Sequence, residues 1–176
     1  VEIEYSDGSG KMEDVTHMLD RALAEDHKIL IFSQFVKHLQ LYVDYFKKEN
    51  IPFCYLDGST KDRQKEVDEF QSSTDKKVFL ISLKAGGLGL NLTAADYVFL
   101  LDPWWNPAIE SQAIDRAYRI GQKNNVFTYK FITRNTVEEK ILLLQQNKLK
   151  LAQDLITTEE SFVKNLSKDD IRSIFE

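Results

Sequence analysis

Two short apolar runs, each broken off by polar or glycine-rich sequence, most constrain what this chain can fold into. They are VFLI at residues 78–81 and YVFLL at residues 97–101. Runs of this length without polar alternation are typical of strands buried on both faces of a parallel sheet. Ser82 and a glycine loop follow the first run, and Asp102 follows the second. Because open parallel sheets bind ligands outside the carboxyl ends of their strands, we expect a functional site at this edge.

Segments with strand-like and helix-like patterns alternate along the chain. The predicted strands cover residues 28–33, 51–56, 78–81, 97–101 and 126–132. The predicted helices cover residues 12–25 and 35–48, a segment ending near 70, a segment over 109–120, and 136–156. Ser59 and Asp62, at S-x-x-D spacing, are expected to cap the third helix. The alternation implies right-handed crossovers and predicts a three-layer α/β domain with one central parallel sheet.

The chain is expected to divide into three regions. Residues 1–10 contain Ser, Gly and Asp in a pattern typical of a linker or a disordered end. Residues 11–135 are expected to form the folded lobe, and residues 136–176 a helix followed by a polar tail. Thr136 and Glu139 form a capping box, which predicts where that helix begins. Because the chain starts with Val, we expect it to begin inside a longer protein.

The composition narrows the class of protein. Net charge is −5, yet residues 1–27 hold eight acidic against two basic residues, which leaves 21 basic against 20 acidic in residues 28–176. A neutral body predicts that any grip on DNA is weak and strongly dependent on salt. Cys54 is the only cysteine and the three histidines are scattered, so we expect no intrachain disulfide, no zinc site and a reducing, intracellular setting. No apolar run approaches the ~20 residues of a membrane span, and the first residues lack a secretory signal.

The helix predicted over residues 109–120 carries two arginines one turn apart. At about 100° per residue, one side is apolar and faces the sheet: Ile109, Ala113, Ala117 and Ile120. A neighbouring arc holds the polar residues: Gln112, Asp115, Arg116 and Arg119. Two guanidinium groups side by side at the rim of a parallel sheet suit a phosphate group. The alternative, for this helix taken alone, is a solvated face on which the arginines pair with Asp115 and Glu110.

Four groups of motifs occur in order along the chain: KILIFSQF at 28–35, YLDGST at 55–60, SLKAGGLGLNL at 82–92 with DPWWNP at 102–107, and QAIDRAYRIGQ at 112–122. Together they resemble the second motor lobe of the Swi/Snf family of DNA-dependent ATPases, a branch of the superfamily-two helicases. The resemblance runs from about residue 11 to residue 156 and implies a RecA-like lobe. It also implies that the helix over 136–156 is a brace that packs back across the lobes, which is compatible with an ordinary amphipathic core helix.

The resemblance implies ATP with Mg²⁺ as the cofactor, bound between two lobes. Arg116 and Arg119 would act as arginine fingers on the γ-phosphoryl group, and Asp115 would orient Arg119. The residues implied to approach the nucleotide from the same side are Gln112, Gly87, Gly89 and Asn91. The sequence contains neither a G-x-x-x-x-G-K-[ST] loop nor an Asp-Glu-x-His string. ATP and Mg²⁺ would therefore be held mainly by a preceding N-terminal lobe, and this chain alone should not hydrolyse ATP.

The resemblance further implies contacts with the backbone of double-stranded DNA at the strand ends. The implied contacts are Ser33, Gln34, Gly58, Ser59, Thr60, Ser82, Lys84, Ala85, Gly86 and Trp105. Hydroxyls, amides and backbone N–H groups bind phosphate oxygens without reading sequence, and an exposed indole can stack on bases or sugars. Trp104 is expected in the core. The alternative for Gly58 and the glycine loop is that they only make turns.

Two positions depart from the family pattern. Tyr118 stands where the family most often has His, and Tyr55 stands where Arg is common, which removes one basic contact with DNA. The leading hypothesis is the second motor lobe of an ATP-dependent double-stranded DNA translocase, located with the bacterial nucleoid in the cytoplasm or in a eukaryotic nucleus. The alternative is a motor-less protein-interaction or regulatory module that retains the fold. A self-sufficient nucleotide-binding enzyme is disfavoured because no complete phosphate loop opens a helix here.

Overall fold

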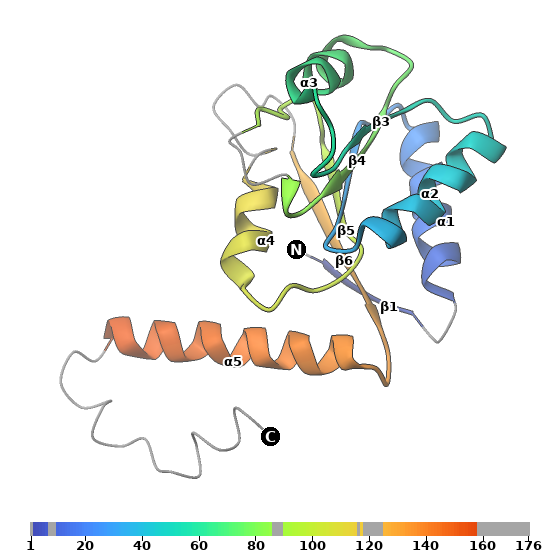
Figure 1. Cartoon of the computed structure of the whole chain (residues 1–176). Helices are drawn as coiled ribbons and strands as arrows, with labels where there is room; N and C mark the ends of the chain where they lie inside the picture. The colour runs from blue at the N-terminus through green and yellow to red at the C-terminus, as the bar shows by residue number, and fades with distance from the viewer. Residues whose placement is uncertain (1, 7–9, 86–89, 116, 118–124, 158–176) are drawn as a thin grey trace.

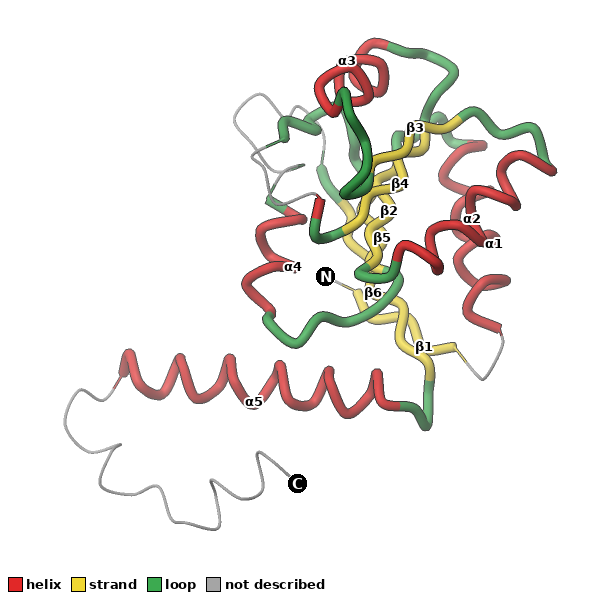
Figure 2. The backbone as a smooth tube through the Cα atoms, in the orientation of Figure 1, coloured by secondary structure: helices red, strands yellow, loops and turns green. Residues whose placement is uncertain are grey.

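The computed structural model describes residues 2–6, 10–85, 90–115, 117 and 125–157. Within them the chain forms one parallel sheet with strand order β1-β6-β5-β2-β4-β3 (Figure 1, Figure 2). The strands are β1 (Glu2–Ser6), β2 (Ile29–Ser33), β3 (Phe53–Leu56), β4 (Val78–Ser82), β5 (Tyr97–Leu100) and β6 (Phe127–Thr133). The helices are α1 (Lys11–Ala24), α2 (Val36–Lys48), α3 (Arg63–Ser72), α4 (Pro107–Ile114) and α5 (Val137–Thr157). The predicted α/β class with a parallel sheet is confirmed.

Helices cover both faces of the sheet. α1 and α2 lie on one face, and α3 and α4 lie on the other (Figure 1). Successive residues of β2 point to opposite faces, as the period of a strand requires. Ile29 and Ile31 pack with buried residues of α1 and α2, whereas Leu30 and Phe32 pack with buried residues of α3 and α4. The predicted three-layer arrangement is therefore confirmed.

The first strand lies where the sequence predicted a linker. β1 pairs in parallel with β6, and Glu2 lies beside Tyr129. The prediction of a linker over residues 1–10 was therefore wrong for this strand. The Ser, Gly and Asp residues that suggested a linker belong to residues 6–10. β1 is held in the sheet by its pairing with β6, which comes much later in the chain. Pairing with a distant strand can outweigh the structure that the local composition favours.

α3 begins later than the sequence suggested. Its N-cap is Asp62, whose carboxylate accepts a hydrogen bond from Lys65 N at 3.0 Å. The predicted cap, Ser59, instead donates its hydroxyl to Asp57 Oδ1 at 2.7 Å in the turn that precedes the helix. The prediction of Ser59 as the cap was therefore wrong, because Asp57 engages the hydroxyl that a cap would use.

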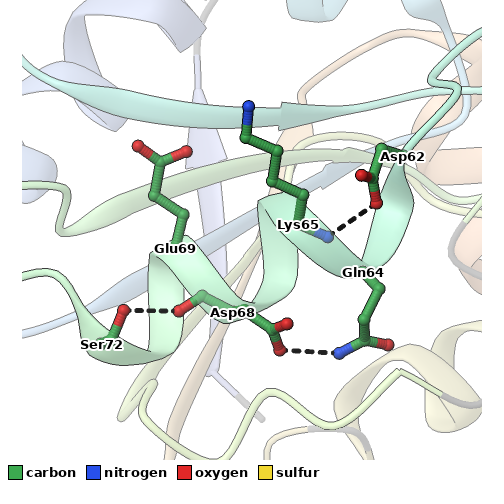
Figure 3. Close-up of a pocket in the computed structure, with 6 residues that line it drawn as sticks. All are labelled: Asp62, Gln64, Lys65, Asp68, Glu69 and Ser72. Carbon is green, nitrogen blue, oxygen red and sulfur yellow. Dashed lines mark hydrogen bonds between the residues drawn. The ribbon is translucent and has the colours of Figure 1, made fainter.

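The solvent-facing side of α3 forms a polar surface pocket (Figure 3). The side chains that line it are Asp62, Gln64, Lys65, Asp68, Glu69 and Ser72. Several of these groups bond to one another along the helix, including Gln64 Nε2 to Asp68 Oδ1 at 2.8 Å. The pocket is therefore a solvated helix face with internally paired groups, and we assign no ligand to it.

α4 ends at Ile114, earlier than predicted. Asp115 caps its carboxyl end, and Ala117 N donates to Ile114 O at 3.0 Å, a three-residue bond that tightens the chain into a turn. The predicted helix is therefore confirmed as far as Ile114, whereas Asp115 and Ala117 lie in turns. The arc that grouped Asp115 with two arginines stays a prediction. Ala113 and Ala117 are buried in the core, as predicted. The described residues exclude Arg116, Tyr118, Arg119 and Ile120.

α5 begins as predicted, with a variant of the capping box. Thr136 Oγ1 accepts from Glu138 N at 3.2 Å, and Glu139 reaches back to Asn135 N at 2.6 Å rather than to the N–H of the cap residue. Lys11 forms an ion pair with Glu138 at 2.5 Å, which ties the first turn of α5 to α1. Within the described part of the chain, no helix combines the length and apolar character that a bilayer span requires.

Two phenylalanines on neighbouring strands allow a test of how the core is packed. Phe99 on β5 is fully buried, whereas Phe127 on β6 is 45% exposed. We expect Phe99→Ala to lower the free energy of unfolding by about 3–5 kcal/mol, because it removes buried contacts and leaves a cavity. Phe127→Ala is the matched control and should cost less than about 1 kcal/mol. Urea unfolding followed by circular dichroism measures both, and equal losses would contradict this packing.

Candidate functional site

The carboxyl ends of the central strands meet at one edge of the sheet. Ser33, the last residue of β2, lies beside Ser82, the last residue of β4. Leu83 N donates to Ser33 O at 2.9 Å, which extends this pairing beyond β4. On the other side of β2, β5 ends at Leu100, and Asp102 bonds to Ser33. Polar residues of separate strands thus lie together at this edge, and their predicted function as a site stays a prediction.

Asp102 holds this edge together. Its carboxylate is 2% exposed and accepts hydrogen bonds from Ser33 Oγ at 2.5 Å and Gln34 N at 2.9 Å, while His38 Nδ1 lies 3.4 Å away. Ser33 Oγ in turn accepts from Phe35 N at 3.0 Å. Several donors offset the cost of burying a carboxylate. The roles of Asp102 and His38 were not predicted from the sequence. For Asp102 a signal was available, because it is an acidic residue directly after a buried strand.

The side chains of Ser33 and Ser82 face the protein rather than solvent. Ser33 is 0% exposed and Ser82 is 2% exposed. Ala85 is also buried, and Gln34 is half-buried with its Nε2 donating to Pro103 O at 3.0 Å. These residues fix the ends of the strands. Their predicted contact with DNA stays a prediction.

Other predicted DNA contacts are more accessible. Lys84, Gly58 and Ser59 are exposed, and Thr60 is half-buried. The turn that contains Gly58, Ser59 and Thr60 is stabilised by its own hydrogen bonds. The Ser59 hydroxyl donates to Asp57 Oδ1, and Thr60 Oγ1 accepts from Asp57 N at 3.0 Å. The hydrogen bond from the Ser59 hydroxyl holds the pKa of the Asp57 carboxyl below its usual range. A charged carboxylate here disfavours a phosphate close to that hydroxyl.

Tyr55, one of the two departures from the family pattern, supports the same turn. Its hydroxyl donates to Asp57 Oδ2 at 3.0 Å. Burial, reinforced by this bond, raises the pKa of Tyr55 to about 12. The hydroxyl therefore stays a protonated donor at neutral pH and stabilises the turn.

The two tryptophans differ in exposure, as predicted. Trp104 is half-buried and packs against the core beneath α3 and α4, whereas Trp105 is 57% exposed. Asn106 accepts from Ala108 N at 3.1 Å and caps α4, and Pro107 is the first helical residue. The Trp105 indole thus lies on a loop that is fixed at the start of α4.

Only some of the residues predicted to approach a nucleotide lie among the described residues. Gln112 on α4 and Asn91 are both exposed. The Asn91 carbonyl accepts from Gln71 Nε2 on α3 at 3.2 Å, which anchors that segment. Five predicted site residues lie outside the described residues: Gly86, Gly87, Gly89, Arg116 and Arg119. Their roles stay predictions.

One group of potential metal ligands occurs in the described ranges. Cys54, Glu66 and Glu69 each place a ligand atom within 4.8 Å of the others. Glu69 already pairs with Lys76 at 2.7 Å, and Glu66 accepts from Tyr55 N at 3.2 Å. Burial raises the pKa of the Cys54 thiol to about 11, so the thiol is protonated at neutral pH. Because these groups are engaged or protonated, we assign no ion to them.

Comparison with known protein families gives a match over most of the chain. Residues 10–121 match the family model described as the helicase conserved C-terminal domain. Among solved structures, the chain is similar to the C-terminal part of the Fun30 ATPase domain. That similarity has a TM-score of 0.75 and 38% sequence identity, and it covers 78% of this chain and 45% of the other.

Several curated proteins are similar in sequence. The chromatin-remodeling ATPase INO80 of Emericella nidulans is 47% identical over 135 residues, which cover 76% of this chain and 8% of that protein. The DNA repair protein RAD5B of Arabidopsis thaliana is 39% identical over 171 residues, covering 95% and 13%. An uncharacterized ATP-dependent helicase of Mycoplasma pneumoniae is 37% identical over 172 residues, covering 97% and 17%. The chain thus spans less than a fifth of the length of these relatives.

The Asp102 network generates a stability prediction. Asp102→Ala should lower the free energy of unfolding by about 2–4 kcal/mol, because it leaves buried donors at the end of β2 without their acceptor. Asp44→Ala removes an exposed carboxylate on α2 that accepts one hydrogen bond from Gln40, and should cost less than about 0.5 kcal/mol. Chemical unfolding of the three proteins measures the difference. A loss for Asp102→Ala no larger than for the control would contradict the anchoring role.

Proposed function

The chain belongs to the family of helicase conserved C-terminal domains, in its Swi/Snf branch, and on this basis we propose that it is the second motor lobe of an ATP-dependent double-stranded DNA translocase. The observation that carries the proposal is the alignment of the carboxyl ends of β2, β4 and β5 at one edge of the sheet. This is the edge at which parallel α/β domains bind ligands. The role would place the full-length protein with DNA, in a bacterial nucleoid or a eukaryotic nucleus.

The proposed grip on DNA depends on backbone contacts and stacking. Lys84 offers an exposed charge, and the turn after β3 offers the exposed residues Gly58 and Ser59. Trp105 offers an exposed indole that can stack without reading sequence. A near-neutral body supplies little long-range attraction, so the preceding lobe would contribute the larger share of affinity.

The proposed role in ATP hydrolysis is to complete a nucleotide site whose main part belongs to the preceding lobe. ATP and Mg²⁺ would be held mainly by the preceding lobe, because this chain has no phosphate loop. Arg116 and Arg119 would stabilise charge that develops on the γ-phosphoryl group. Gln112 and Asn91 are exposed, and with Gly87 and Gly89 they would approach the nucleotide as the lobes close.

The finger role predicts a separation of ATP binding from turnover. In the full-length protein, Arg116→Ala and Arg119→Ala should each lower DNA-stimulated ATP hydrolysis by about 10³-fold or more. Affinity for ATP should change little, because the base of the pocket belongs to the preceding lobe. Steady-state ATPase assays at saturating DNA and binding of a fluorescent ATP analogue measure the two effects.

An exposed arginine elsewhere on the lobe is the matched control. Arg21→Ala on α1 should retain wild-type turnover. Wild-type turnover in both Arg116→Ala and Arg119→Ala would refute the finger role. Measurable ATP hydrolysis by the isolated chain would favour a self-sufficient enzyme instead.

The two proposed kinds of DNA contact should respond differently to salt. Lys84→Ala should weaken DNA binding equally on all sequences and reduce the slope of log K against log salt by about 1. Trp105→Ala should weaken binding by about five- to tenfold with little change in that slope, because stacking releases no counterions. Fluorescence anisotropy of the full-length protein on several duplexes, over a range of salt concentrations, measures both.

Lys48→Ala is the matched control for the charge. Its ammonium is strongly exposed at the carboxyl end of α2, away from the proposed site. This variant should leave both the affinity and the salt slope unchanged. A slope that is the same in Lys84→Ala and wild type would remove Lys84 from the DNA contact.

A further inference from the structure

A buried polar cluster joins α5 to the loop that carries the tryptophans. It consists of Glu110 on α4, Lys130 on β6 and Gln145 on α5, which are 4%, 8% and 2% exposed. Lys130 Nζ forms an ion pair with Glu110 and donates to Gln145 Oε1 at 3.0 Å. Gln145 Nε2 donates to Glu110 Oε1 at 2.8 Å, which closes the ring. Three consecutive elements of the chain thus meet in one hydrogen-bonded cluster.

Further hydrogen bonds of this cluster go to the main chain of Trp104. Trp104 N donates to Glu110 Oε1 at 2.6 Å, and Gln145 Nε2 also donates to Trp104 O. Side chains from α4 and α5 therefore hold both backbone polar groups of this residue. The next residue is Trp105, whose ring is exposed. The backbone from which the Trp105 ring extends is thus positioned by the cluster.

A buried ion pair is by itself weak evidence of a stabilising role. Buried ion pairs can often be replaced by apolar residues of similar size without loss, whereas a cluster that loses one member leaves costly unsatisfied groups. Hydrogen bonds are directional, so the cluster fits one position of α5 against α4. What the cluster contributes is therefore a defined position of α5 relative to the Trp104 backbone.

The cluster also lies where α5 leaves the lobe. Gln145 is the last fully buried residue among those of α5 whose side chains are described, and residues 146–150 are all exposed. Figure 1 shows α5 running past α4. A displacement imposed on the second half of α5 would reach the buried contacts of this helix at Gln145, and through it the backbone of Trp104.

We propose that Gln145 is a positioning residue that couples α5 to the Trp104–Trp105 loop, so that the placement of α5 sets how Trp105 meets DNA. The DNA part of this inference rests on the proposed function, whereas the positioning of the loop does not. Gln145 acts through the Trp104 backbone and itself touches no nucleic acid. Glu110 and Lys130 serve as the fixed side of the connection, because both belong to the packed body of the lobe.

The first experiment observes the loop without DNA. The full-length protein is labelled with 5-fluorotryptophan, and the Trp105 resonance is assigned by its loss in Trp105→Phe. Gln145→Met keeps the size of the side chain but removes its amide, and should shift or broaden this resonance. Gln146→Met, at the exposed neighbouring position, is the matched control and should leave the resonance unchanged. An unchanged resonance in Gln145→Met would overturn the proposal.

A second variant keeps the experiment informative if Gln145→Met fails to fold. Gln145→Glu has the same shape and keeps an acceptor for Lys130, but it has no amide hydrogens for Trp104 O. It should change the Trp105 resonance in the same way. A wild-type resonance in this variant would equally overturn the proposal.

The last experiment separates positioning from a general loss of structure by a double-mutant cycle. Gln145→Met should raise the DNA concentration needed for half-maximal ATPase stimulation by about five- to tenfold, with kcat at saturating DNA unchanged. In the Trp105→Ala background it should have no further effect. Additive effects would mean a structural role alone and would overturn the coupling. If Trp105→Ala binds DNA as wild type while the resonance responds to Gln145→Met, the DNA contact fails and the positioning of the loop stands.

Discussion

The in-register pairing of β2 with β4 and β5 is the constraint on which the rest of this lobe depends. Parallel strands joined by helical crossovers all end at the same edge of the sheet. Because β2 is buried on both faces, polar groups are tolerated only where it ends, at Ser33. The same holds for β4, which ends at Ser82. The apolar strands thereby direct the polar chemistry of separate segments to one line of the surface.

The loop between β5 and α4 is held at three points. At its start, the carboxylate of Asp102 binds the end of β2 and the beginning of α2. In its middle, the buried cluster binds the backbone of Trp104, and at its end Asn106 caps α4. Trp105 lies between these anchors with more than half of its surface in solvent. An exposed aromatic ring on a firmly held backbone loses little entropy when it stacks, which would suit the proposed contact with DNA.

The layers of the fold could be predicted from the sequence because they follow from local patterns. The uninterrupted apolar run of β4 and the spacing of Val15 and Leu19 on α1 each describe one buried surface, whatever the rest of the chain does. The different exposure of Trp104 and Trp105 also followed from their immediate neighbours. The motifs that carry the family resemblance are short and ordered, so they could be recognised without a structure.

The features that could not be predicted depend on distant partners or on competition between near neighbours. Residues 2–6 alternate polar and apolar side chains as a strand does, but nothing within them indicates that the partner of β1 is β6. Ser59 and Asp62 both lie near the start of α3, and only the structure shows which one caps it. Glu110, Lys130 and Gln145 share no spacing or motif, so their meeting is a property of the folded chain alone.

The charge and the short length of the edge strands bear on aggregation in a lobe that would move against a neighbour. β1 contains Glu2 and Glu4, and the opposite border is β3, a strand of four residues that begins just after Pro52. Charged or very short border strands are poor templates for the addition of a foreign strand. A domain bounded in this way can separate from its partner and return many times without recruiting other chains into fibrous assemblies.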